Sequence, residues 1–306
     1  MKILIYGAGV IGQIYAARLQ QAGHDVTVLA RDRTHERLAR DGIVLANGAA
    51  SSQVRVTVTD RVGPESSFDL ALVTVRRDQV DEILPALADL PAASVLLMQD
   101  NSLGLARAGD IVGRDRVLFG FPGVGGYRKD DGAICYIEIR QQPTTLGRRD
   151  GREKAVRAVL ESAGFAVQTT DDMDGWLKTH AVFIAAVGAS IYSCGGDARA
   201  LAADRAGVAA MVSAVGEGFR ALAGNGVKVT PLPLRVIFTV VPKMFAVRYW
   251  QGQLRGPVGT VSLAPHLRAT KDTEMVALCR DVRRLVEGSV PTPYLDELLS
   301  AVGVAR

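Results

Sequence analysis

The first residues whose types and spacing could do chemistry form a glycine-rich run that fits the pattern G-x-G-x-x-G. The run consists of Gly7, Ala8, Gly9, Val10, Ile11 and Gly12. In this pattern the first glycine makes a tight turn, the second lets a pyrophosphate approach the backbone, and the third lets a helix pack closely on a strand. The N-terminus of that helix offers free N–H groups and partial positive charge to phosphates. We therefore predict that this run binds a dinucleotide.

The residue that follows the next strand selects between NAD and NADP. An NAD site uses a carboxylate about 20 residues beyond the glycines to accept a hydrogen bond from the ribose 2′-hydroxyl. Here Arg31 stands first after the strand at 25–29, and Asp32 follows one position later. A guanidinium can hold a 2′-phosphate with paired, charge-assisted hydrogen bonds. We therefore expect NADP as the cofactor. The alternative is that Arg31 and Arg33 are only solvated loop charges.

These residues need strands that end at a common edge of a sheet, and the sequence supplies them. A short apolar strand at 2–6 precedes the glycine run, and a helical pattern at 14–21 follows it. The continuous apolar run at 69–75 is typical of a parallel strand buried on both faces. Arg76 and Arg77 follow this strand directly, where open α/β sheets bind their ligands.

Strand and helix patterns alternate up to residue 169, as in a doubly wound fold. Further strands are expected at 94–98, 117–121, 133–139 and 165–169, with strand-like pieces at 43–46 and 54–58 around the turn signal Asn47-Gly48. Helices are expected at 33–40, 79–90 and 153–163. From Trp176 onward the apolar spacing is mostly helical, and an apolar helix at 236–250 is broken at Pro242. We therefore predict an α/β Rossmann domain over residues 1–170 and an all-α domain over residues 171–306.

The net charge, the aromatic content, the length of the apolar runs and the cysteine count exclude several classes of protein. Net charge is +4, but the basic residues are dispersed and only 6% of residues are aromatic, so we expect no nucleic-acid partner. No apolar run approaches the roughly 20 residues of a membrane-spanning helix, and the chain enters a strand at once, so neither membrane insertion nor a signal peptide is expected. The three scattered cysteines predict buried, free thiols, with no disulfide framework and no metal site. These features predict a cytoplasmic protein.

Over nearly its whole length the chain resembles the ketopantoate reductase (2-dehydropantoate 2-reductase) family. The matching pieces, in order, are Gly7–Gly12 with Arg31, Val73–Arg76, Asn101–Gly104, Trp176–Lys178, and a last piece from Ser262 through Arg268-Ala269 to Thr273-Glu274. The glycine run alone is shared by many families. The Trp-x-Lys piece combined with the Arg-Ala and Thr-Glu piece is far more specific.

The resemblance implies that a hydride passes from NADPH to the ketone of a 2-oxo acid. It implies that Lys178 donates the proton to the oxygen, because an ammonium stabilises the negative charge that hydride addition builds there. It further implies that Glu274 and Ser262 hold the lysine and the substrate, and that Asn101 lies beside nicotinamide and substrate. Arg76 takes the place of a lysine that helps hold the 2′-phosphate. A homodimer built through the helical domain is also expected from the resemblance.

Each of these residues also has a purely structural interpretation. Lys178 could lie in the first turn of a core helix and extend its amine to solvent. Glu274 could belong to the acidic first turn of a helix, Ser262 could be a helix cap, and Asn101 could be a turn residue. His180 lies two positions past Lys178 and so points away from its face of a helix, and we assign it no role.

Three positions depart from the family pattern. Val182 and Ala186 stand where the family has asparagines, which predicts a less polar pocket than ketopantoate needs. The loop of Asn101 carries an extra residue, Asp100. One alternative hypothesis is therefore an NADPH-binding sensor that has lost turnover. An enzyme working in the oxidative direction, or an imine reductase, also remains open at this point.

Overall fold

The computed structural model spans residues 1–306 and describes all of them except 48–49, 64, 101, 289 and 305–306. The chain forms two compact units. The first unit holds residues 1–99 and 104–173, and the second holds residues 100–103 and 174–306. We expected the boundary between the two domains at residue 170, and in the structure the first unit ends at residue 173. The short segment 100–103, however, joins the second unit from within the first part of the chain.

The first unit is built on an eight-stranded sheet with the order β12-β11-β8-β7-β6-β1-β2-β5. Its strands are β1 (Lys2–Tyr6), β2 (Asp25–Leu29), β5 (Thr57–Thr59), β6 (Phe68–Val73), β7 (Ala92–Leu97), β8 (Val117–Phe121), β11 (Thr144–Gly147) and β12 (Val167–Thr170). Neighbouring strands are parallel except β8 and β11, which are antiparallel. The predicted α/β class with a Rossmann-like first domain is confirmed, and the sheet is mixed.

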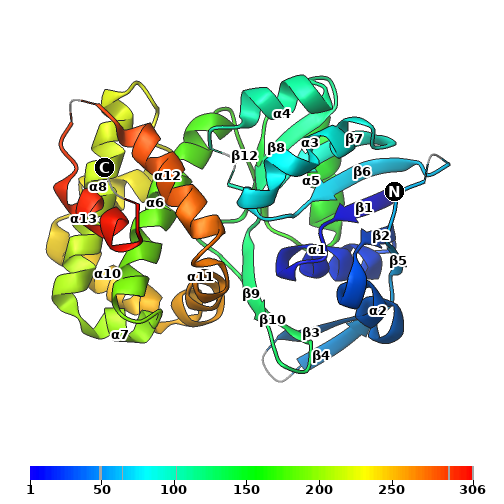
Figure 1. Ribbon diagram of the computed structural model, residues 1–306, viewed down its shortest axis with the longest axis horizontal. Helices are drawn as coiled ribbons and strands as arrows, with labels where there is room; N and C mark the ends of the chain where they lie inside the picture. Colours follow the sequence, from blue (N-terminus) through cyan, green and yellow to red (C-terminus); the bar gives the residue numbers. More distant parts are fainter. Residues whose placement is uncertain (48–49, 64, 101, 289, 305–306) are drawn as a thin grey trace. The chain divides into compact units, whose positions relative to one another are not determined.

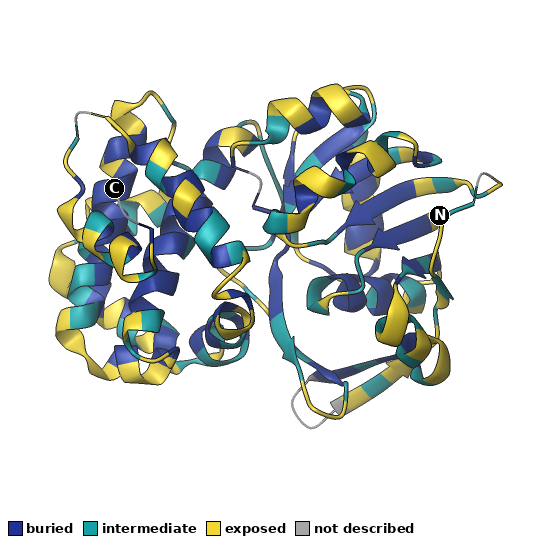
Figure 2. Cartoon of the chain, viewed as in Figure 1, coloured by how far each residue is buried: buried dark blue, intermediate teal, exposed yellow. Residues whose placement is uncertain are grey.

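Successive residues of the central strands enter two different cores, one on each face of this sheet. Ile3 and Ile5 of β1 pack with α1 (Val10–Gln21) and α5 (Arg152–Ser162) on one face. Leu4 and Tyr6 pack with α3 (Val80–Ala88) and α4 (Leu105–Val112) on the other. Burial on both faces explains why these strands are continuous apolar runs. Figure 2 shows them largely in the colour of buried residues, under helices with exposed outer sides.

A second, four-stranded sheet lies against α1 and was not predicted (Figure 1). Its order is β4 (Ala50–Val54), β3 (Ile43–Asn47), β10 (Ile134–Glu138) and β9 (Val124–Arg128). The strand expected at 54–58 is therefore wrong, because residues 50–54 pair antiparallel with β3 and residues 57–59 join β2 in the main sheet. Gly48 of the expected turn lies outside the described residues. Helix α2 (Asp32–Asp41) and the 3₁₀ turn η1 (Arg77–Gln79) complete this unit.

The second unit is entirely helical in the part that the structure describes, which confirms the predicted class. Its helices are α6 (Met173–Ser193), α7 (Ala198–Ala203), α8 (Arg205–Gly224), α9 (Leu232–Thr239), α10 (Lys243–Arg255), the π-helical η2 (Val258–Leu263), α11 (Ala264–Thr270), α12 (Glu274–Val286) and α13 (Pro293–Ala301). Pro242 is the N-cap of α10, so the predicted break in the apolar segment at 236–250 is confirmed. Helix α8 is long and apolar enough to cross a membrane, but 61% of its most apolar window is buried inside the structure.

All three cysteines are free. Cys279 is buried as expected, whereas Cys135 and Cys194 are only half-buried, which corrects the expectation for those two thiols.

Candidate functional site

Three neighbouring parallel strands bring the predicted cofactor residues to one edge of the main sheet. Tyr6, the last residue of β1, is opposite Leu29 of β2 on one side and Val73 of β6 on the other. The glycine run, the Arg31 segment and the Arg76 segment therefore leave the sheet at the same level. In open α/β sheets this carboxyl edge is where ligands bind.

The three glycines of the run differ in the space that surrounds them. Gly7 has a φ of +118°, and a Cβ there would lie 3.0 Å from the backbone N of Val75. A Cβ on Gly12 would lie 2.0 Å from the carbonyl oxygen of Gly7 and 2.6 Å from Thr74 Oγ1. A Cβ on Gly9, by contrast, would meet no atom within 4 Å. Gly7 and Gly12 are thus required by the fold, whereas Gly9 leaves open space.

That open space lies at the start of α1. Gly9 is the N-cap of α1 and supplies no side chain to satisfy the first N–H groups of the helix. These donors, with the partial positive charge of the helix end, suit a pyrophosphate. Ala8, Val10 and Ile11 are partly exposed around it. The residues present therefore fit the phosphates of a dinucleotide.

The two arginines predicted to hold a 2′-phosphate differ in their surroundings. Arg31 is the N-cap of α2, is exposed, and its guanidinium has no hydrogen bond or ion pair within the described residues. Arg76 is the N-cap of η1, and its Nε lies 3.2 Å from Oδ1 of Asp78. Arg31 is ready for an anionic ligand. Arg76 must first exchange the Asp78 carboxylate for one.

Asn101 lies outside the described residues, but its flanking residues carry buried polar atoms. Gln99 donates from Nε2 to the carbonyl oxygen of Val73 at 3.0 Å. Gln99 Oε1, Asp100 Oδ1 and Ser102 Oγ are buried without a hydrogen-bond partner within the described residues. Buried polar atoms are normally hydrogen-bonded to protein, water or ligand. The loop that carries Asn101 therefore has the donors and acceptors that a polar ligand group such as a carboxamide needs.

In the helical unit, Lys178 lies in the second turn of α6. Its Nζ is 2.5 Å from Oδ2 of Asp174, one turn earlier on the same helix. The Lys178 side chain is 20% exposed. The ammonium is thus neither a core group nor a freely solvated one, and it is held by a carboxylate that the sequence analysis did not single out.

Ser262 and Glu274 come from the segment that links α10 to α12. Ser262 is buried in the π-helical turn η2, so it is not a helix cap. Single π-helical turns are frequent at functional sites. Glu274 is the first residue of α12, and its Oε2 lies 3.5 Å from Nε2 of His266. The carboxylate expected to hold Lys178 therefore lies beside the imidazole of His266.

The sequence analysis missed a buried histidine–carboxylate pair in the same unit. His180 Nδ1 lies 2.9 Å from Oδ2 of Asp100, and both residues are buried. The ring of Trp176 stacks on His180, with a centroid distance of 5.1 Å and an interplanar angle of 7°. Trp176 and His180 are four positions apart on α6, a spacing that could have predicted their contact. The pair attaches the loop of Asn101 to the helix that carries Lys178.

Val182 and Ala186 do not line an open pocket. Both are fully buried in the hydrophobic core of the helical unit. A Cβ on Gly218 of α8 would lie 2.4 Å from Cγ1 of Val182, so α6 and α8 are closely packed there. The inference of a less polar pocket from these two positions is therefore not supported by their location.

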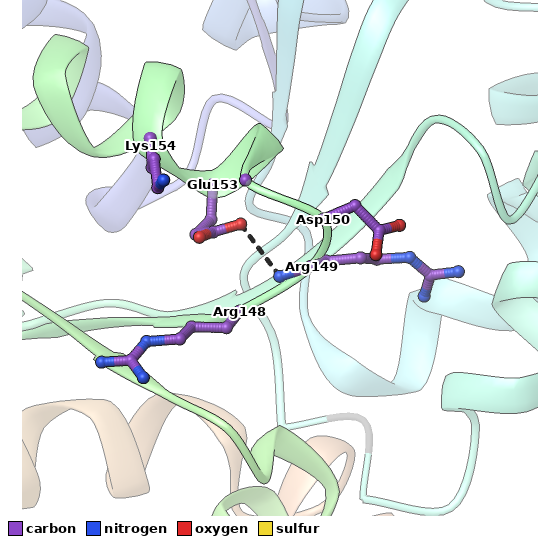
Figure 3. A pocket seen from close by; sticks show the side chains of 6 residues that line it. Arg148, Arg149, Asp150, Glu153 and Lys154 are labelled. Carbon is purple, nitrogen blue, oxygen red and sulfur yellow. Dashed lines mark hydrogen bonds between the residues drawn. The ribbon is translucent and has the colours of Figure 1, made fainter.

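A hollow of about 470 Å³ elsewhere in the first unit is lined by residues at the start of α5 (Figure 3). Arg148 and Arg149 point in opposite directions from it. Glu153 already occupies the helix N-terminus, because its Oε2 accepts a hydrogen bond from the backbone N of Arg149 at 2.9 Å. This hydrogen bond lowers the pKa of Glu153. The Glu153 carboxylate already occupies the position that an anion would take, so we do not regard this hollow as the functional site.

Among the residues that the structure describes, no group of three or more His, Cys, Asp or Glu side chains could hold a metal ion. The described residues offer an ammonium, carboxylates, an imidazole and a glycine-rich loop at a helix N-terminus.

Comparison with known proteins finds one family model and several reductases that are similar to this chain. The family model described as ketopantoate reductase PanE/ApbA matches residues 3–151. The 2-dehydropantoate 2-reductase of Archaeoglobus fulgidus is 29% identical over 192 residues, which are 61% of this chain and 62% of that protein. The chain thus spans about three fifths of the length of this relative.

Solved structures establish the fold over the whole chain. The 2-dehydropantoate 2-reductase from Geobacter metallireducens has a TM-score of 0.79 at 17% identity, covering 99% of each chain. A D-mandelate dehydrogenase solved with NADH and anilino(oxo)acetate has a TM-score of 0.76 at 16% identity, covering 99% of this chain and 97% of that one. At these identities the likeness concerns the fold alone.

Proposed function

We propose, from the match of residues 3–151 to the ketopantoate reductase PanE/ApbA family model, that this chain reduces a 2-oxo acid to the 2-hydroxy acid with NADPH. The observation that carries the proposal is the carboxyl edge of the main sheet. There the segments that carry Gly9 and Arg31 leave the sheet at the same level, with open space at Gly9 and no partner for the Arg31 guanidinium among the described residues. A phosphate-binding loop combined with a cation after the second strand favours NADPH over NADH. The cytoplasm is the compartment that fits such a reaction.

When bound, the reduced nicotinamide supplies the hydride. We assign to the Lys178 ammonium the stabilisation of the developing negative oxygen and the donation of its proton to that oxygen. Asp174, at 2.5 Å, restricts where this ammonium can lie. Ser262 and Glu274 are assigned to holding the substrate, and Asn101 to contact with the nicotinamide. Within the glycine run, Gly9 admits the pyrophosphate, and Arg31 with Arg76 binds the 2′-phosphate.

The proposal is tested by single-turnover oxidation of NADPH with a panel of 2-oxo acids. We expect turnover of at least one acid by the wild type, and a rate about 10²–10⁴-fold lower for Lys178→Ala, as is typical for loss of a general acid. NADPH affinity should be unchanged in this variant. The matched control is Lys228→Ala, which removes an exposed lysine from the same unit. Equal rates for Lys178→Ala and wild type would refute the assignment of the proton donor.

The sensor alternative predicts NADPH binding without reduction of any ketone. It was motivated by Val182 and Ala186, which the structure buries in the helical core. No other observation favours it, and steady turnover of any ketone in the same assay would eliminate it.

We also propose that the protein is a homodimer formed through the helical unit. Helices α9 and α10 and their flanks carry large apolar side chains that are exposed, namely Leu232, Val240, Met244, Phe245 and Tyr249. Large apolar side chains exposed on two helices that contact each other favour a protein–protein interface. Sedimentation velocity should show a dimer for the wild type and a monomer for Met244→Glu with Phe245→Glu. A monomeric wild type at micromolar concentration would contradict this part of the proposal.

A further inference from the structure

Two guanidinium groups converge on one buried amide beside the glycine run. Gln13 directly follows Gly12 and is fully buried. Its Nε2 donates to the carbonyl oxygen of Ala8 at 2.7 Å, which fixes the orientation of the amide. Its Oε1 then accepts from Arg37 of α2 and from Arg128 at the end of β9, each at 3.4 Å. Three elements of the first unit therefore place two positive charges at a common point.

Neither guanidinium forms an ion pair among the described residues, and both donate to the neutral amide of Gln13. Burial lowers the pKa of Arg128 to about 10, and the nearby charge of Arg37 adds to this effect. Burial also lowers the pKa of Arg37, with Asp41 opposing the shift and Arg40 adding to it. The two positive charges thus destabilise each other in a partly buried place.

Two other partly buried arginines, Arg18 and Arg283, are paired with carboxylates. Arg18 lies 2.5 Å from a carboxylate oxygen of Glu138, with a side chain that is 14% exposed. Arg283 lies 3.1 Å from a carboxylate oxygen of Asp296 and is 15% exposed. Arg37 and Arg128 differ from these two arginines, because each donates to the neutral amide of Gln13 and not to a carboxylate.

We propose that Arg37, Arg128 and Gln13 form a binding site for a phosphate-type oxyanion. A guanidinium presents a planar fork of donors that matches two oxygens of a phosphate, and two such forks match a dianion. The hydrogen bonds to Gln13 are long, at 3.4 Å, so an anion with shorter, charge-assisted bonds can replace them. Gln13 keeps both guanidinium groups oriented while no anion is bound.

The phosphate can come from two sources. One is a phosphate of the dinucleotide, since Gln13 is hydrogen-bonded to the glycine run; this source rests on the function proposed above. The other is a separate phosphorylated small molecule. The chemistry of recognition is the same for both, so the experiment must separate them.

The probe is inorganic phosphate, added to the whole protein at constant ionic strength with chloride as the reference anion. We expect phosphate to raise the melting temperature of the wild type and to bind with measurable heat in calorimetry. Arg37→Gln and Arg128→Gln should each weaken phosphate binding at least about tenfold, as expected for loss of one charge-assisted pair. The matched control is Arg40→Gln, because Arg40 lies on the same helix, is exposed and is paired with Asp41.

A second measurement separates a binding site from a structural one. Without phosphate and at low salt, Arg37→Gln and Arg128→Gln should melt at the same temperature as wild type or higher, because each removes a charge repulsion. Arginines that served only to hold Gln13 would give the opposite result. A lower melting temperature in both variants with unchanged phosphate affinity would overturn the proposal.

Titration of phosphate in the presence of saturating NADP⁺ identifies the source. Competition between the two ligands assigns the site to a phosphate of the dinucleotide, and simultaneous binding assigns it to a separate molecule. Both outcomes support the site, and neither depends on turnover of a 2-oxo acid. Absence of phosphate binding to the wild type, together with NADP⁺ affinity unchanged in both variants, would overturn it.

Discussion

The two units of this protein build their candidate sites by different means. In the first unit, backbone geometry makes the site: glycines permit close approach, and parallel strands end together at one edge of the sheet. In the helical unit, pairs of side chains make it, such as Lys178 with Asp174 and His180 with Asp100. The first kind of site should be sensitive to an added methyl group. The second should be sensitive to a lost charge or hydrogen bond.

The largest effect should follow from Gly12→Ala in the first unit. The new Cβ would lie 2.0 Å from the carbonyl oxygen of Gly7, so α1 and β1 must move apart. We expect a loss of about 3 kcal/mol in the free energy of unfolding of this unit and no measurable NADPH binding. Circular dichroism in urea and an NADPH fluorescence titration measure the two effects.

Gly9→Ala is the matched control, because its Cβ meets no atom within 4 Å. Its stability should change by less than about 1 kcal/mol, the usual cost of alanine at an N-cap. NADPH binding should nevertheless weaken, since the methyl group occupies the space left for the pyrophosphate. If Gly12→Ala proves as stable as Gly9→Ala, backbone approach does not define this site.

The next effect tests the side-chain pairs of the helical unit. Asp100→Asn leaves His180 without its carboxylate in a buried place, and we expect a loss of about 2 kcal/mol in the unfolding free energy. Both tryptophans, Trp176 and Trp250, belong to this unit, so tryptophan fluorescence in urea reports its unfolding specifically. A double-mutant cycle with His180→Gln isolates the coupling of the pair.

His266→Gln supplies the control for that cycle. The His266 side chain is 49% exposed and lies 3.5 Å from Glu274, so its loss should cost less than about 0.5 kcal/mol. Equal losses for the Asp100 and His266 variants would show that burial does not distinguish these two pairs.

The same contrast explains what the sequence could predict. The glycine run, the strands around it and the break at Pro242 were predictable because each depends on residues within a few positions of one another. Strand β9 was missed because Gly125 and Gly126 lower its strand propensity. A Cβ on Gly126 would lie 2.3 Å from the carbonyl oxygen of Cys135, a constraint that only the paired structure reveals.

In the candidate site, what was missed depends on contacts between distant residues. Asp100 and His180 are 80 positions apart, and no local pattern connects them. The pairing of Lys178 with Asp174 spans four positions and was within reach of helical spacing, but the resemblance directed attention to Glu274. The π-helical turn that holds Ser262 was not predicted, because such a turn has no simple sequence signal.

The preference for NADPH over NADH tests how much side chains contribute to cofactor binding in the first unit, where backbone geometry forms the site. Arg31→Ala removes an exposed guanidinium that has no partner in the described part of the chain. We expect NADPH to bind roughly tenfold more weakly and NADH to bind unchanged, because only NADPH carries the 2′-phosphate. Arg33→Ala, two positions away, is the control and should leave the ratio of the two affinities as it is. Equal losses for both nucleotides would mean that Arg31 acts on the loop rather than on the 2′-phosphate.

The smallest expected effect tests whether water is excluded from the core of the helical unit. Burial raises the pKa of the Cys279 thiol from 9.0 to about 12. In the unfolded chain this thiol loses its proton above about pH 9, while the folded protein keeps it, so stability falls as pH rises from about 9 towards 12. Between pH 8 and pH 10 the wild type should lose roughly 1 kcal/mol more than Cys279→Ala, which has no thiol to titrate.

Tryptophan fluorescence in urea at the two pH values measures this difference in slope, whatever stability the alanine variant loses through its cavity. Tyr192, whose pKa burial also raises, is present in both proteins and so largely cancels. Equal slopes for wild type and Cys279→Ala would mean that the thiol titrates in the folded protein. The helical unit would then lack the water-free interior on which its buried side-chain pairs depend, and the contrast with the backbone-defined site of the first unit would no longer hold.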